Sequence, residues 1–193
     1  MELDIETFSQ KSLYSYIGMQ FNMDKLSKEA VDPLDFENTF VQPSKIAGEG
    51  LFAKKTLSMG SVIAIYSGKL VDNSSKILHV KDESLKEELH KNLLTLNKTF
   101  AIDIPPTFGS LKKYKGSYGH KANHSFKYFN SKYGMAYHPR YGSIRSIVAI
   151  RNIKKGEEIL VDYLLGSRGD NVPEWYSNLY ELEEGKNWYK WWE

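Results

Sequence analysis

From Asp32 onward, the chain consists of short apolar runs separated by Gly, Asn and Ser. Runs of this length and spacing are typical of buried or half-buried β-strands. We therefore expect strands in the runs 61–66, 94–96, 100–104 and 144–150. Because the turn-like pair Asn97-Lys98 separates the second run from the third, the segment 94–104 is predicted to form a β-hairpin.

Two segments follow a helical pattern instead. Within 82–93, Leu85, Leu89 and Leu93 recur every fourth residue among charged neighbours, which predicts a surface helix with one buried stripe. A second helix is predicted to open at Pro173-Glu174-Trp175, because proline suits the first turn of a helix. The pattern as a whole predicts a mainly β domain with a few short helices, in the α+β class.

The same pattern suggests how the chain is divided. Residues 1–31 show no clear period and are predicted to be an extension of unknown role. Residues 32–168 are predicted to form the main domain, since a chain of 193 residues with 41% apolar content can bury one core. Residues 169–193 form a predicted helical segment whose many aromatic side chains need a surface to cover them. They are Tyr176, Tyr180, Trp188, Tyr189, Trp191 and Trp192.

Charge and composition limit the classes of function. With 26 basic and 24 acidic residues the net charge is +2, too small to favour direct binding of nucleic acid or an anionic membrane. No apolar run approaches the ~18 residues that cross a bilayer, and the acidic start Met1–Glu6 does not resemble a secretory signal, so we expect a soluble protein. The absence of cysteine excludes disulfides and cysteine-built zinc clusters, and the five histidines lack a metal-binding spacing.

Three segments carry candidate chemistry: Ala47–Phe52, Gly119–Phe126 and Gly156–Tyr163. Taken alone, each has an ordinary interpretation. The pair Gly48 and Gly50 suits a surface turn, Asn123-His124 suits a turn or a core hydrogen bond, and Tyr163 is one of 13 tyrosines, most of which belong to a core or a sheet edge.

In this order and at these intervals, the three segments resemble the signature segments of SET-domain protein-lysine methyltransferases. The resemblance covers roughly residues 32 to 192. It implies a β-clip fold, a C-terminal helix, and a knot-like threading in which the segment with Tyr163 passes under the loop that bears Asn123-His124, an arrangement exceptional elsewhere. It also implies S-adenosylmethionine as cofactor, S-adenosylhomocysteine as product, and no metal.

The chemistry of that family explains why these residue types are wanted. A neutral lysine amine must attack a sulfonium methyl in line, so proximity and orientation lower much of the barrier. Burial itself lowers the pKa of a lysine, and water can carry off its proton. Tyrosine rings suit the walls of a lysine channel, because the ring passes the apolar stem while the hydroxyl orients the amine.

The resemblance assigns roles residue by residue. The implied catalytic tyrosines are Tyr163, beside the transferred methyl, together with Tyr66 and Tyr133. The implied cofactor-binding residues are Ala47, Gly48, Glu49, Gly50, Asn123, His124 and Trp175. Without the resemblance, Trp175 would be interpreted as packing between helix and core.

The resemblance narrows to the zinc-free SET7/9-type histone H3 lysine monomethyltransferase branch, although its MORN repeats are absent here. The shared pieces are Asp32-Pro33, Ala47–Phe52, Ile102–Pro105, Gly119–Phe126, His138–Arg140 followed by an aromatic residue and Gly142, and Pro173–Tyr176.

In that branch a tyrosine crowds the amine and limits methylation. Counting back from His138 places this crowding tyrosine at Tyr133. The chain has one extra residue between Asn123 and His138, which leaves Tyr128 as the alternative. The aromatic position two before Tyr163 is Val161 here, which agrees with Tyr133 as the crowding residue, and a further channel tyrosine aligns with Leu165. The resemblance thus implies mainly monomethylation.

The implied partner is a protein with a lysine-bearing tail, with the histone H3 tail as the expected substrate, and the expected state is a monomer. Two alternatives stay open: a catalytically weak SET-fold module that binds peptides, and a methyltransferase of a non-histone protein. We expect an intracellular location, in the nucleus or the cytoplasm, with delivery into a host cell as the alternative.

Overall fold

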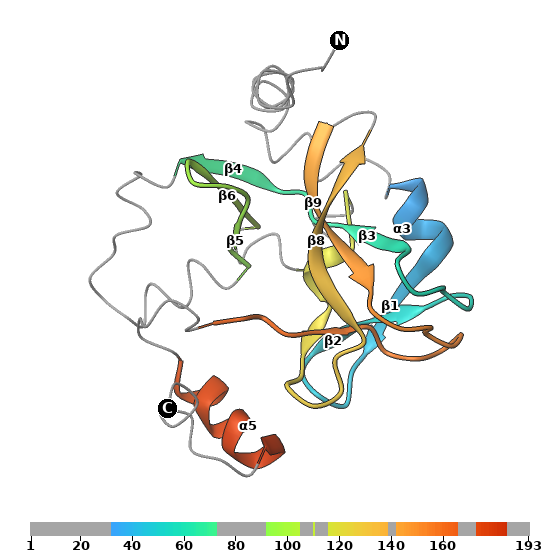
Figure 1. The fold of residues 1–193 in the computed structure, drawn as a ribbon, viewed down its shortest axis with the longest axis vertical. Coiled ribbons are helices and arrows are strands. Elements are labelled where there is room, and N and C mark those ends of the chain that lie inside the picture. Colours follow the sequence, from blue (N-terminus) through green and yellow to red (C-terminus); the bar gives the residue numbers. More distant parts are fainter. Residues whose placement is uncertain are drawn as a thin grey trace.

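The computed structural model describes residues 32–72, 92–104, 110, 116–138, 142–165 and 173–184. Most of the elements in these residues are strands, and the helices are short (Figure 1). The helical elements are α3 (Pro33–Asn38), the 3-10 turn η3 (Gly119–Lys121) and α5 (Glu174–Glu184). The strands are β1 (Thr39–Pro43), β2 (Glu49–Ala53), β3 (Val62–Ile65), β4 (Lys69–Asp72), β5 (Leu94–Thr95), β6 (Phe100–Asp103), β7 (Asn123–His124), β8 (Ser131–His138), β9 (Gly142–Ala149) and β10 (Leu160–Val161). This architecture confirms the predicted fold class.

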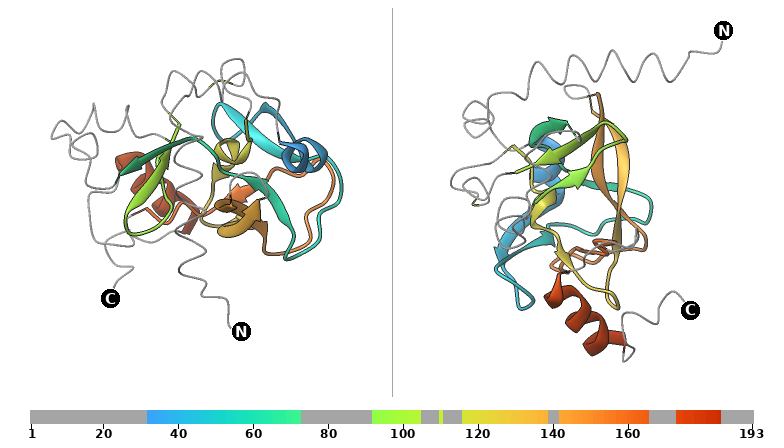
Figure 2. Two further views of the ribbon diagram at one scale, coloured as in Figure 1. Left: turned by 90° about the horizontal axis from the view of Figure 1, so that it is seen from above. Right: turned by 90° about the vertical axis from the view of Figure 1, so that its left-hand side faces the viewer.

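The largest sheet has five strands in the order β3-β9-β8-β10-β7. Its centre is a long antiparallel hairpin of β8 and β9, paired from Ser131 opposite Ala149 to His138 opposite Gly142. Burial largely alternates along β9, since successive side chains of a strand point to opposite faces. The tip of this hairpin and α5 lie at opposite ends of the molecule (Figures 1 and 2).

β10 lies between two strands that precede it in the sequence. It runs parallel to both β7 and β8, and the loop 125–130 joins those two strands. At either end of that loop, the Ser125 amide donates to the Val161 carbonyl (3.2 Å) and the Asn130 amide donates to the Leu160 carbonyl (3.1 Å). The segment leading to Tyr163 is therefore inserted inside the loop that follows Asn123-His124, as the predicted threading requires.

The hairpin predicted in 94–104 is also present. β5 and β6 pair antiparallel, with Leu94 opposite Ile102, and β4 lies on the other side of β6. The turn is closed by Asn97, whose side-chain oxygen accepts hydrogen bonds from the amides of Thr99 (2.8 Å) and Phe100 (2.9 Å). Asparagine favours turns because its side chain can bond to the backbone in this way.

The other expected elements have mixed outcomes. The runs 61–66 and 144–150 correspond to β3 and β9, and Pro173 immediately precedes α5. The predicted helix in 82–93 lies almost wholly outside the described residues, as do Trp188, Tyr189, Trp191 and Trp192. No helix in the described part of the chain is long and apolar enough to cross a bilayer.

Two apolar clusters form the core. One lies between β3 and the sheet of β4, β5 and β6, and it includes Ile65, Tyr66 and Ile102. The other lies between β2, β3 and β9, and it includes Leu51 and Ile147. Tyr133 of β8 packs against both clusters, so its ring lies where they meet.

Candidate functional site

The first predicted segment forms a tight turn that leads into β2. The Ser44 amide donates to the Gly48 carbonyl (2.9 Å), and Gly48 has φ of +47°, a conformation that glycine adopts without steric cost. Gly50 lies inside β2, where an added Cβ would collide with the Glu158 carboxylate. The two glycines therefore serve different purposes: Gly48 allows the turn, and Gly50 allows a close approach.

Asn123 connects this turn to the second segment. Its side-chain Nδ2 lies within hydrogen-bonding distance of the Ala47 carbonyl (3.1 Å), the Glu49 carbonyl (3.4 Å) and Glu158 Oε1 (3.1 Å). The Glu49 side chain pairs with Lys121, whose Nζ lies 2.8 Å from Oε2. Asn123 thus holds the turn in place, and each carbonyl keeps a second lone pair that can accept from a cationic N–H group.

His124 is buried, with 4% of its surface exposed, and it contacts the third segment. Its Nδ1 lies 3.1 Å from the Tyr163 amide and 3.2 Å from the Val161 carbonyl. Burial lowers the pKa of the imidazole, against the opposing charge of Asp162, so the ring is neutral at pH 7. Its Nε2 is buried and has no hydrogen-bond partner among the described residues.

Tyr163 follows β10 and lies against His124, with ring centroids 5.1 Å apart. Its hydroxyl donates to the Ala122 carbonyl (3.0 Å). Burial raises the pKa of this phenol to about 12, so Tyr163 stays protonated at physiological pH. The third segment is thus fixed to the second through both the backbone and the side chain of this residue.

The other two predicted tyrosines lie close together. The rings of Tyr66 and Tyr133 meet edge to face, with centroids 6.4 Å apart, and the Tyr66 hydroxyl donates to the Asn92 carbonyl (2.7 Å). Burial raises the pKa of Tyr133 well above its usual range, with a smaller effect from its electrostatic neighbours Tyr163 and Asp162. The structure therefore groups Tyr66, Tyr133 and Tyr163.

The alternative residue, Tyr128, does not join them. It lies on the loop 125–130, is 61% exposed, and has Lys127 Nζ 5.5 Å from its ring centroid. Of the two positions considered from the sequence, the structure brings Tyr133 and not Tyr128 next to Tyr66.

Trp175 lies at the start of α5 with 48% of its surface exposed. Its ring centroid is 6.3 Å from that of His124 and 6.3 Å from that of Tyr163. The predicted members of the site therefore come from distant parts of the sequence, and Trp175 provides an apolar ring with an accessible surface beside them.

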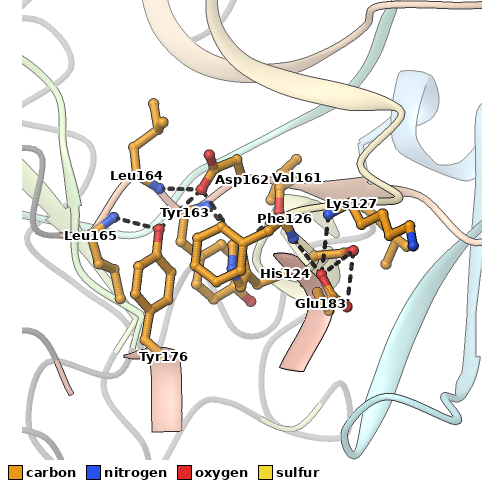
Figure 3. Close-up of polar contacts among 12 residues, drawn as sticks. His124, Phe126, Lys127, Val161, Asp162, Tyr163, Leu164, Leu165, Tyr176 and Glu183 are labelled. Atoms are coloured by element: carbon orange, nitrogen blue, oxygen red, sulfur yellow. Dashed lines mark hydrogen bonds and ion pairs between the residues drawn. The ribbon is translucent and has the colours of Figure 1, made fainter. Parts of the chain in front are cut away.

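A polar network holds the turn that follows Tyr163 (Figure 3). Asp162 Oδ1 accepts hydrogen bonds from the Leu164 amide (2.9 Å) and the Tyr176 hydroxyl (3.1 Å). The Tyr176 oxygen accepts in turn from the Leu165 amide (3.2 Å), and the Tyr176 ring stacks on His124 with centroids 4.6 Å apart. Leu165, where the resemblance expects a tyrosine, is half-buried in this turn.

Several of these residues were not foreseen from the sequence. Tyr176 was noted as an aromatic of the tail and as the end of the shared piece Pro173–Tyr176, without a role in the site, and its spacing from Tyr180 on one helix face was the available signal. Asp162 and Glu158 lie within the third segment but carried no signal of their own, because a carboxylate in a sequence is most often solvated.

The comparison with protein families matches residues 48–164 to the SET domain. The chain belongs to the SET domain family. The match contains all three signature segments apart from Ala47, and Trp175 lies beyond it. The predicted boundaries of the SET domain, 32–168, extend past the matched residues and stay a prediction.

Two curated proteins illustrate what this SET domain is similar to. The chain is 34% identical over 155 residues to the histone-lysine N-methyltransferase SETD7 of Halocynthia roretzi, which covers 76% of this chain and 38% of that protein. It is 31% identical over 130 residues to an H3 lysine-36 specific histone-lysine N-methyltransferase of Debaryomyces hansenii, covering 66% of this chain and 16% of that protein. The first match confirms the resemblance to the SET7/9-type branch, and this chain spans well under half the length of either relative.

The SET domain suits the cofactor that the resemblance implies. The carbonyls of Ala47 and Glu49 suit the ammonium of an amino-acid moiety, the buried Nε2 of His124 can form a hydrogen bond with a ligand, and the exposed face of Trp175 suits a purine. No group of three or more His, Cys, Asp or Glu able to hold a metal ion occurs within the ranges the structure describes.

Proposed function

We propose that this SET domain is a protein-lysine N-methyltransferase that uses S-adenosylmethionine. The observation that carries the proposal is the grouping of Tyr66, Tyr133 and Tyr163, of which Tyr163 is attached to the segment Gly119–Phe126 by its hydroxyl and its amide. When bound, S-adenosylmethionine supplies a methyl group on a sulfonium, which the lone pair of a neutral lysine amine displaces. The residues of this chain bind and align the two reactants.

The hydroxyls of Tyr66 and Tyr163 act as hydrogen-bond acceptors toward the reactants. Each phenolic proton is already donated to a main-chain carbonyl, of Asn92 and Ala122 respectively. The oxygen that remains can accept from an amine N–H, or stabilise the partial positive charge that develops on a transferred methyl. Acceptors fixed in this way need no reorganisation during the reaction.

Neither Tyr133 nor Tyr163 acts as the base. Burial raises the pKa of Tyr163 to about 12, and it also raises the pKa of Tyr133 well above its usual range. A phenol with such a pKa binds its proton firmly at pH 7. The lysine must therefore lose its proton to water before the methyl is transferred, and burial of the lysine favours that loss.

We further propose that the main product is monomethyl-lysine. Tyr133 packs against Tyr66, and its hydroxyl has no hydrogen-bond partner among the residues the structure describes. It can therefore donate to the lysine amine, and its bulk opposes a second methyl. Removal of the hydroxyl should make room for further methylation.

The proposed substrate is a lysine in a protein tail, with histone H3 as the first candidate. The support is that the two similar proteins are named as histone-lysine methyltransferases, the second specific for H3. The proposed location follows from that substrate: the nucleus, or the cytoplasm where new histones are made. Methylation of a non-histone protein remains the second candidate.

The proposal is tested by methyl transfer from labelled S-adenosylmethionine to core histones and to a whole-cell protein extract, read by mass spectrometry. Wild type, Tyr163→Phe and Tyr133→Phe are compared. Tyr163→Phe should lower transfer by about two orders of magnitude, since it removes one fixed oxygen at the reacting centre. Tyr133→Phe should keep activity and add di- and trimethyl-lysine.

The outcomes separate the candidates. Labelled lysine in histones that disappears in Tyr163→Phe supports the proposed function, and label only in other proteins supports the non-histone substrate. Cofactor binding without transfer to either pool would instead favour a module that binds peptides. Unchanged monomethylation by Tyr133→Phe would contradict the role given to that residue.

A further inference from the structure

Glu183, near the C-terminal end of α5, binds the start of the loop 125–130, directly after Asn123-His124 (Figure 3). Its Oε2 accepts hydrogen bonds from the amides of Phe126 (2.8 Å) and Lys127 (3.1 Å), and the Ser125 hydroxyl donates to the same oxygen (3.0 Å). Consecutive amides directed at one carboxylate form an anion-binding nest. The half-buried carboxylate of Glu183 thus accepts hydrogen bonds from three donors of a loop, none of which belongs to a strand.

The position of Glu183 in the helix is unfavourable in other respects. A negative charge in the last turn of a helix opposes the helix dipole, and the last turn of α5 contains no basic residue. The contacts with the loop 125–127 therefore offset a local cost. Glu181, two positions earlier on the same helix, is exposed and makes none of these contacts.

Glu183 belongs to one face of α5. Tyr176, Tyr180 and Glu183 follow the spacing i, i+4 and i+7, which brings residues to the same side of a helix. Tyr176 and Tyr180 pack on the Phe126 ring, with centroids 4.6 and 4.9 Å away, and Glu183 binds the backbone of the same segment. Together they determine how α5 lies against residues 124–127.

The far end of the loop is held differently. The Asn130 side chain donates to the Glu158 carbonyl (2.7 Å) and accepts from the Leu160 amide (3.0 Å), so that end is attached to the segment of β10. At the near end, Glu183 is the charged anchor. Without it, the position of α5, and of Trp175 at its start, would rest on the aromatic contacts and on the hydrogen bonds of the Tyr176 hydroxyl with Asp162 and Leu165.

We propose that Glu183 is a positioning residue for the cofactor site. Its hydrogen bonds go to Ser125, Phe126 and Lys127, not to the site tyrosines, and it holds α5 so that Trp175 covers the site beside His124. This inference rests on the proposed function, because the affinity it supports is that for S-adenosylmethionine. It predicts that a change 8 residues beyond Trp175 in the sequence weakens cofactor binding.

The test uses the full chain as wild type, Glu183→Ala, Glu183→Gln and the matched control Glu181→Ala. Affinity for S-adenosylhomocysteine is measured by calorimetry, and amide hydrogen exchange of Phe126 and Lys127 by NMR. Glu183→Ala should weaken affinity about tenfold and speed exchange of both amides, because charge-assisted hydrogen bonds are lost. Glu183→Gln should lie between, and Glu181→Ala should match wild type.

Two controls make the result specific. The Ser125 amide, which donates to Val161, should keep its slow exchange in every variant and so report an intact sheet. Faster exchange of Phe126 and Lys127 with unchanged affinity would overturn the positioning role. Equal losses in Glu183→Ala and Glu181→Ala would overturn it too. If wild type itself bound no S-adenosylhomocysteine, the proposed function would fail first, and this inference would fail with it.

Discussion

Leu164 is a leucine in a backbone conformation that favours glycine. Its φ is +53°, the single positive value at a non-glycine residue among those described. The conformation is maintained because the Leu164 amide donates to Asp162 Oδ1 in the network around Tyr163. Left-handed backbone costs a non-glycine residue about 1–2 kcal/mol, and strain of this kind concentrates at functional sites.

Leu164→Gly is therefore expected to stabilise the protein. The relief of strain exceeds the extra entropy of glycine in the unfolded chain, so the free energy of unfolding should rise by about 0.5 kcal/mol. Little burial is lost, since Leu164 is 56% exposed. Denaturant unfolding measures the change. Leu164→Val serves as the opposite control, because a β-branched residue is less tolerant of positive φ and should destabilise.

Asp35 of α3 is a fully buried carboxyl. Its Oδ1 accepts from the Ile65 amide (2.9 Å) and its Oδ2 from the Tyr118 amide (2.6 Å), so it connects the strand before Tyr66 to the segment before Asn123. Burial raises its pKa to about 8, although the two amides oppose that change. The folded protein therefore holds a proton that the unfolded chain releases near pH 4.

This difference predicts a direction for stability against pH. Between about pH 4 and 8 the native state binds more protons at this site than the unfolded state, so its contribution to stability falls as pH rises. Asp35→Asn should be less stable than wild type at pH 5, because an amide NH₂ faces one of the two donors. The gap should narrow by pH 9, where wild type buries a charge. Parallel urea titrations that keep a constant gap would contradict the assignment.

At the scale of elements, η3 and β3 approach each other closely. A Cβ added to Gly119 would collide with the Ile65 carbonyl oxygen and lie 3.0 Å from its carbon. Both are backbone atoms of the strand that leads to Tyr66, and they cannot move aside as a side chain can. The glycine that opens the segment Gly119–Phe126 is thus required by backbone packing.

Gly119→Ala should lower the melting temperature markedly, by the equivalent of about 2–3 kcal/mol. Gly134→Ala is a suitable comparison, because its added Cβ would meet Val148 Cγ2 at 2.9 Å, which belongs to a side chain that can rotate. Thermal unfolding of the two variants should differ, with Gly134→Ala the milder. Equal melting temperatures would argue against a rigid contact at Gly119.

Elements with local signals were predicted well. The hairpin 94–104 was identified from apolar runs around Asn97-Lys98, and the start of α5 from Pro173. The strand β2 was expected as a loop around Gly50, because its first residues carry a glycine and a glutamate. Only its pairing with β1 and the nearby Glu158 carboxylate explain why glycine stands in a strand there.

Residues whose roles depend on long-range contacts were not predictable from the chain alone. The three tyrosines and Asn123-His124 were found through the family resemblance, and the structure groups them. Asp35 and Glu183 were missed, because their partners lie 83 and 57 positions away. Without knowledge of such partners, a charged residue in a short helix is predicted to lie on the solvated face of the helix.

At the scale of the whole molecule, the proposed cofactor site joins three parts of the chain: the turn 47–50, Asn123-His124, and Trp175 of α5. A ligand that binds only the assembled site stabilises the folded state. S-adenosylhomocysteine at 100 times its dissociation constant should raise stability by about 2.7 kcal/mol, seen as a higher melting temperature. Trp175→Ala should reduce that shift while changing the ligand-free melting temperature much less.

The insertion of β10 between β7 and β8 also has a consequence for biosynthesis. A ribosome releases residues 123–149 well before residues 160–161, so the growing polypeptide holds β7 and β8 with a vacant position between them. Strand edges left open in this way invite pairing with other chains. A chain that ends at residue 159 should therefore aggregate more readily than one that ends at residue 165, which includes β10; light scattering of the two chains measures the difference.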